Sequence, residues 1–106
     1  MELPFFSVVI PLTDRTVHLL PFTLDSIVSQ SLSSFEIIII DGQKKQHSLD
    51  VFKAYLPHVT QICCPLNDNI YSMMNEGIGL ARGTYVHFLL PGEFYISQHA
   101  FSFLWR

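Results

Sequence analysis

The chain has 106 residues, of which 49% are hydrophobic and 14% are charged, and its formal net charge is −3. This length suits one domain, and the hydrophobic fraction excludes an intrinsically disordered chain. The lack of excess positive charge excludes a protein that binds nucleic acid through a basic surface. Because a small domain exposes a large share of its surface, so few charges predict that another chain, or a further part of this one, covers some of it.

The N-terminus and the cysteines indicate where the protein works. Residues 1–4 lack the basic region and cleavage site of a signal peptide, and no apolar run is long enough for a transmembrane segment. Cys63 and Cys64 are neighbours, and adjacent strand residues point to opposite faces, which makes a disulfide between them difficult. We therefore predict two reduced, buried thiols and a cytoplasmic protein.

Segments typical of strands and of helices alternate along the chain. A β-rich run covers residues 5–11, and apolar residues at helical spacing then predict a helix over 21–31, with Pro21 in its first turn. The run FEIIIID at 35–41 contains four consecutive isoleucines, without the alternation of a half-exposed strand. Such a run is typical of a strand buried on both faces in the middle of a parallel sheet.

The second half of the chain continues this order. We expect a short helix, a strand, the clearest helix, a strand and a final helix at residues 49–56, 59–64, 67–83, 84–90 and 97–106. In the clearest helix, one of residues 67–69 would cap the start and Gly83 lies where a C′ glycine belongs. Arg82 is expected to stabilise its C-terminal end, with a phosphate contact as the alternative. The order predicts an α/β fold with a mostly parallel sheet of about four strands and helices on both faces.

Three acidic residues follow the expected strands at their carboxyl ends, where open α/β sheets bind ligands. They are Asp14, Asp41 and Glu93. Asp14 is better explained as a loop or capping residue, whereas for Asp41 and Glu93 a binding role and a structural role are equally open. No G-x-G-x-x-G turn, P-loop lysine motif or G-x-S-x-G elbow is present, which disfavours dinucleotide oxidoreductases, P-loop phosphotransferases and α/β-hydrolases.

Four segments in this order resemble a known family. They read SVVIPLTDR, LDSIVSQSL, FEIIIIDG and NIYSMMNEGIGLARGTYVHFLLPGEFY, and begin at residues 7, 24, 35 and 69. Together they are similar to the start of a family-2 glycosyltransferase with the Rossmann-like GT-A fold. The resemblance covers nearly the whole chain and implies one nucleotide-sugar-binding domain over residues 1–106, incomplete at its C-terminus.

The resemblance also implies a ligand site. The ligand would be a nucleotide-diphospho-sugar of the UDP type, held with a divalent cation, Mn or Mg. The implied nucleotide-binding residues are Pro11, Thr13, Asp14, Asp41, Gln43 and Asn75. Asp41 would hold the base or ribose, since an ionised carboxylate accepts hydrogen bonds from an imide N–H or from hydroxyls. Glu93 is the implied metal ligand, because its hard oxygens suit these cations.

The chain departs from the family pattern in several places. Asp14 replaces the usual asparagine, and residues 43–48 lack the family's second acid. The turn at 90–93 retains only one carboxylate, Glu93, which should weaken a cation site. In the family, the acceptor-binding half and the general base follow this turn, so the resemblance assigns no base within this chain.

The C-terminal residues keep a second hypothesis open. Phe101, Phe103, Leu104 and Trp105 form an apolar group with no later segment of this chain to pack against. They would contact either a missing C-terminal half or a second copy in a homo-oligomer. Under this hypothesis the chain is a catalytically inactive remnant that acts as an interaction or oligomerisation domain. Neither hypothesis includes a nucleic-acid partner.

Overall fold

The computed structural model describes residues 4–30, 34–43, 53–65, 67 and 69–93. The helix expected at 97–106, with its apolar group, and the loop after Gln43 lie outside the described residues. The elements in chain order are β1 (Phe6–Leu12), the 3₁₀ helix η1 (Val17–Leu19), α1 (Leu20–Val28), β2 (Phe35–Asp41), the 3₁₀ helix η3 (Lys53–His58), β3 (Gln61–Cys63), α2 (Ile70–Leu80) and β4 (Tyr85–Phe88).

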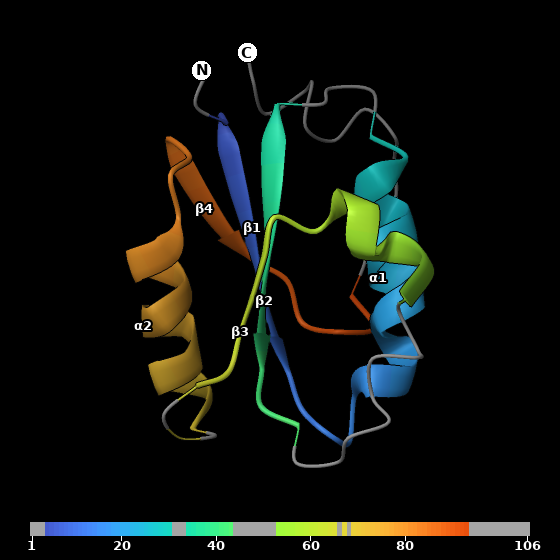
Figure 1. Cartoon of the computed structure of the whole chain (residues 1–106), viewed down its shortest axis with the longest axis vertical. Helices are drawn as coiled ribbons and strands as arrows, with labels where there is room; N and C mark the ends of the chain where they lie inside the picture. Colours follow the sequence, from blue (N-terminus) through green and yellow to red (C-terminus); the bar gives the residue numbers. More distant parts are fainter. Residues whose placement is uncertain (1–3, 31–33, 44–52, 66, 68, 94–106) are drawn as a thin grey trace.

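The described strands form one four-stranded sheet in the order β3-β2-β1-β4. Each of the three pairings between these strands is parallel. Figure 1 shows α2 on one side of the sheet, with α1 and η3 on the other. The expected α/β fold, with a parallel sheet of four strands and helices on both faces, is therefore confirmed.

The core has two halves, one on each face of the sheet. Alternate side chains of β1 and β2, including Ile37 and Ile39, pack with α1, while Ile38 and Ile40 pack with Met73 of α2. All four isoleucines have no exposed surface. Burial of each contributes roughly 2 kcal/mol, so the run that resembled a doubly buried strand supplies much of the core.

Helix α1 begins one residue before Pro21, which lies in its first turn as predicted, and ends at Val28. Tyr55 of η3 is hydrogen-bonded to this helix, because its hydroxyl donates to Asp25 Oδ1 at 2.6 Å. The hydrogen bond to Asp25, followed by slight burial and by the negative charge of Asp25, raises the pKa of Tyr55 above its ordinary value. Pro57 lies inside η3, so the prediction that it stops a helix at residue 56 was wrong. The fixed φ of proline fits 3₁₀ geometry.

Helix α2 is shorter than predicted at both ends. Asn69 caps its start, since its side-chain oxygen accepts from the N–H groups of Tyr71 and Ser72. The helix ends at Leu80, because Ala81 is extended with φ −69° and ψ 136°. Gly83 is therefore no left-handed C′ residue. A Cβ there would lie 2.6 Å from Ser7 Oγ and 2.7 Å from Ser7 N, so glycine is needed for close approach to β1.

The two cysteines differ from the prediction in their exposure. Both are free thiols, but Cys63 is half-buried and Cys64 is exposed. The physical reason is the position of β3, which pairs with β2 alone and forms one end of the sheet among the described strands. Its side chains are covered less than those of the two central strands.

Candidate functional site

The carboxyl ends of β1 and β2 lie side by side. Leu12 is the register partner of Asp41, and the Gly42 N–H donates to the Leu12 carbonyl at 2.8 Å. A Cβ at Gly42 would lie 3.0 Å from both the Leu12 carbonyl oxygen and Met73 Cε, so glycine lets the strand ends meet. Thr13 and Gln43 follow at the same edge. The structure thus brings together three of the residues expected to bind nucleotide.

The Asp41 carboxylate is oriented by Gln43, two residues later in the chain. Its Oδ1 accepts from the backbone N–H of Gln43 at 3.0 Å and from Gln43 Nε2, also at 3.0 Å. Among the described residues, neither hydrogen bond uses Oδ2, and the side chain is half-buried. The carboxylate is therefore held in one orientation and retains an oxygen that can accept from a ligand.

The loop after β1 is closed by two threonines. The Thr13 carbonyl accepts from the N–H groups of Thr16 and Val17, both at 3.1 Å, and the two threonine hydroxyls lie 3.1 Å apart. This turn leads into η1 and α1. Asp14 is exposed at the turn, next to the half-buried Thr13.

Pro11 lies within β1, one residue before the end of the strand and before the loop that follows. It is buried and pairs in register with Ile40. A proline here is tolerated for a geometric reason. Odd-numbered β1 residues bond toward β4, as the Val9 carbonyl does to Leu89 N, and β4 pairing ends at Val9. The N–H that Pro11 lacks would point beyond that pairing, so no ladder bond is lost.

Asn75 lies away from these strand ends. It is an exposed residue in the middle of α2, whereas Met73 of the same helix is fully buried against the sheet. Asn75 is therefore not a structural amide buried in the core. A role in binding would require a ligand that extends along the outer surface of α2.

The acidic turn after β4 is closed by two hydrogen bonds between Leu90 and Glu93. The Glu93 N–H donates to the Leu90 carbonyl at 2.9 Å, and Glu93 Oε1 accepts from the Leu90 N–H at 2.7 Å. Gly92 has φ 98°, a left-handed conformation that residues other than glycine rarely adopt. The Glu93 side chain is exposed, so the turn presents one carboxylate to solvent.

Glu93 is hydrogen-bonded to Leu90 and to Thr23 of α1. Thr23 is a residue that the sequence did not single out. Within the described part of the chain, no three His, Cys, Asp or Glu side chains are grouped as metal ligands. Glu93 fits a cation only where a diphosphate and water supply the other oxygens.

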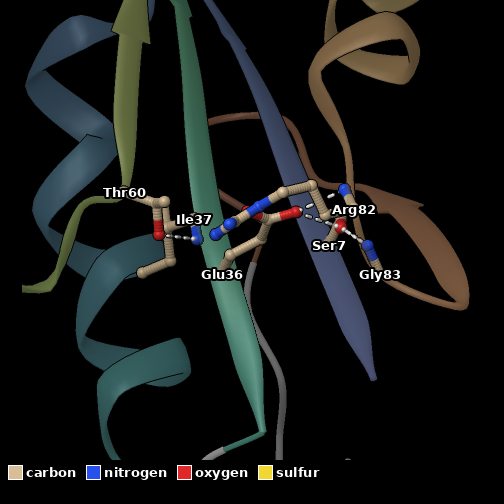
Figure 2. A network of polar contacts seen from close by, with 6 residues as sticks. All are labelled: Ser7, Glu36, Ile37, Thr60, Arg82 and Gly83. Atoms are coloured by element: carbon tan, nitrogen blue, oxygen red, sulfur yellow. Dashed lines mark hydrogen bonds and ion pairs between the residues drawn. The ribbon is translucent and has the colours of Figure 1, made fainter. Parts of the chain in front are cut away.

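A second polar group lies at the amino ends of the strands, opposite to the carboxyl ends described above, and Figure 2 shows it from close by. Glu36 of β2 is only 3% exposed. Its Oε2 accepts from Ser7 Oγ at 2.6 Å and from the Arg82 backbone N–H at 2.7 Å, and the Gly83 N–H donates to Ser7 Oγ at 2.8 Å. These bonds fasten the connection between α2 and β4 onto β1 and β2.

The structure gives Arg82 a partner that neither of the two expected roles included, since α2 ends at Leu80 with no basic residue in its last turn. Arg82 Nε lies 3.4 Å from Glu36 Oε1, at the amino ends of the strands, so it pairs with a buried carboxylate and not with a ligand at the carboxyl ends. Sequence reasoning missed Glu36. The available signal was a carboxylate at the second position of a strand that is otherwise apolar until Asp41.

The comparison with protein-family models decides the ancestry of the chain. The model described as Glycosyl transferase family 2 matches residues 7–89, from the second residue of β1 to the residue after β4. The chain belongs to glycosyl transferase family 2. The family resemblance of the sequence is thereby confirmed.

Proteins described as glycosyltransferases are similar in sequence. A "PGL/p-HBAD biosynthesis glycosyltransferase" of Mycobacterium bovis (strain BCG / Pasteur 1173P2) is 35% identical over 92 residues, which cover 84% of this chain and 36% of that protein. An "Uncharacterized glycosyltransferase EpsJ" of Bacillus subtilis (strain 168) is 30% identical over 105 residues, or 94% of this chain and 29% of that protein. The chain thus spans about a third of the length of these curated relatives.

Solved structures have the same fold as this chain. S. aureus TarS matches with a TM-score of 0.74 and 17% identity over 93% of this chain and 18% of that one. TarS 1-349 in complex with UDP-GlcNAc matches with a TM-score of 0.66 and 18% identity over 84% of this chain and 27% of that one. In the part of the chain that the structure describes, no helix has the length and apolar character needed to cross a membrane.

Proposed function

We propose that this family-2 glycosyltransferase chain binds the nucleotide-diphospho-sugar donor, of the UDP type, for transfer of the sugar to an acceptor. The observation that carries the proposal is the carboxylate of Asp41 at the carboxyl end of β2, with one oxygen oriented by Gln43. The carboxyl edge is where open α/β sheets take ligands. The similar fold of TarS 1-349, which is described in complex with UDP-GlcNAc, supports the ligand class.

In this proposal Asp41 contacts the nucleoside. Its Oδ2 accepts a hydrogen bond from a base N–H or a ribose hydroxyl, while Oδ1 stays bonded to Gln43. Thr13 and Asp14 flank the nucleotide from the neighbouring loop, and Pro11 supports that loop from within β1. Asn75 is a further contact, offered from the exposed surface of α2.

Glu93 is the residue that we propose as the ligand of a divalent cation, Mn or Mg. Such a cation would neutralise charge on the diphosphate and favour departure of the nucleotide. Because the turn offers one carboxylate, binding of the cation depends on the diphosphate being present.

We also propose that the protein works in the reducing cytoplasm. The free thiols of Cys63 and Cys64 are in keeping with this compartment.

Replacement of Asp41 by asparagine tests the nucleotide site. Asparagine keeps an oxygen that can accept from Gln43 but removes the charge that strengthens the bond to the ligand. We expect the Kd for UDP, measured by calorimetric titration, to rise about tenfold or more, since a hydrogen bond to a charged group contributes roughly 1.5–3 kcal/mol.

Asp25→Asn is the matched control, because it removes the same charge from an exposed position on α1. The Asp25 carboxylate accepts a hydrogen bond from the Tyr55 hydroxyl. The Kd of this variant for UDP should equal that of the wild type. Equal affinities for the Asp41→Asn variant and the wild type would refute the role of Asp41.

A further inference from the structure

Thr23 connects α1 to the acidic turn although the two are far apart in sequence. Its hydroxyl donates to the Glu93 carbonyl at 2.6 Å and accepts from the Gly92 N–H at 2.9 Å. The side chain has no exposed surface. One buried hydroxyl thus binds the backbone N–H of Gly92 and the backbone carbonyl of Glu93.

The hydroxyl is not needed by its own helix. A threonine within a helix commonly bonds back to a carbonyl one turn earlier, but here the side chain bonds to the turn at 92–93 instead. Its own carbonyl accepts from Ser26 Oγ at 2.7 Å. Since a buried hydroxyl requires partners, the contact with the turn is the reason that α1 can carry a polar side chain at this core position.

The contacts of the turn place the Glu93 carboxylate step by step. Thr23 fixes the backbone at Gly92 and Glu93, and the left-handed Gly92 sets the direction in which the chain leaves. Glu93 Oε1 is then held by the Leu90 N–H, with the side chain exposed to solvent. Hydrogen bonds within the turn thus orient the carboxylate, and one hydroxyl of α1 ties the turn to the rest of the domain.

We propose that Thr23 is a positioning residue for the cation and diphosphate site. It holds the acidic turn so that the single carboxylate of Glu93 faces the bound diphosphate. A site with one protein carboxylate has no second ligand to correct a misplaced one, so fixed geometry matters more than in a site with several acids. This inference rests on the proposed function, because it requires Glu93 to bind a cation.

The test compares Thr23→Val, which keeps the shape and loses the hydroxyl, with Thr23→Ser, which keeps the hydroxyl. For each protein the Kd for UDP is measured with MnCl2 and with EDTA, and the ratio of the two values is the readout. We expect the ratio of the Kd in EDTA to the Kd in MnCl2 to be at least about fivefold smaller in the valine variant than in the wild type. In the serine variant this ratio should stay within about twofold of the wild-type value. A merely structural role would lower Tm in the valine variant without changing the ratio.

A second readout follows the contact itself without any ligand. The Gly92 amide hydrogen, bonded to the Thr23 hydroxyl, should exchange slowly in the wild type and the serine variant and faster in the valine variant, as measured by NMR. Equal exchange in all three proteins would overturn the inference, as would an unchanged ratio in a folded valine variant that binds UDP. Failure of the wild type to bind UDP would instead refute the proposed function, and the amide readout separates the two cases.

Discussion

Replacing Glu36 by alanine should lower the free energy of unfolding by about 3 kcal/mol, because two short hydrogen bonds to a buried carboxylate are lost. Ser7 Oγ and the Arg82 backbone N–H donate to the same oxygen at 2.6 and 2.7 Å. Without it, both donors remain in a site that was 3% exposed. Urea unfolding followed by circular dichroism measures the change.

Arg82→Ala is the informative comparison for Glu36→Ala. The guanidinium is 3.4 Å from Glu36 and its side chain is 46% exposed, whereas the stronger bond comes from the backbone N–H, which alanine keeps. An ion pair of this exposure contributes less than about 1 kcal/mol. Equal losses of stability in the two variants would show that the ion pair, and not the backbone contact, holds the connection between α2 and β4.

The second large effect concerns two glycines of the same helix, α2. An alanine Cβ at Gly77 would overlap Val9 Cγ1, which is fully buried in β1, so the helix and sheet would have to separate. We expect Gly77→Ala to lower the free energy of unfolding by roughly 2 kcal/mol, the usual cost of overpacking a core. Thermal and urea unfolding would both report it.

Gly79→Ala is its matched control in the same helix. A Cβ at Gly79 meets no atom within 4 Å, so only the higher helix propensity of alanine remains, and stability should rise by up to about 1 kcal/mol. The two substitutions are therefore expected to have opposite signs. Loss of stability in both variants would contradict the packing of α2 on β1 described above.

Elements defined by local pattern were predictable from the sequence. The isoleucine run gave β2 its bounds at Phe35 and Asp41, because a strand buried on both faces needs apolar residues at every position. Pro21 marked the start of α1 for an equally local reason, whereas residues 67–69 offered three candidate caps for α2, of which the structure uses Asn69. The carboxyl edge of β1 and β2 then followed from the parallel order of the strands.

The features that sequence reasoning missed depend on contacts between distant residues. Glu36 meets partners 29 and 46 residues away, and Thr23 meets the acidic turn 69 and 70 residues away. No local pattern reveals such pairs. Gly83 was given a capping role because it follows a helix, whereas its actual constraint is the backbone of Ser7 in another strand.

The measurement that tests the account most directly is a calorimetric titration of UDP into the wild-type chain, once with MnCl2 and once with EDTA. The proposed donor site, with Asp41 at the nucleoside and Glu93 at the cation, predicts saturable binding that Mn2+ strengthens. Glu93→Gln should remove the strengthening while leaving binding in EDTA. No heat of binding at millimolar UDP in either condition would contradict the account.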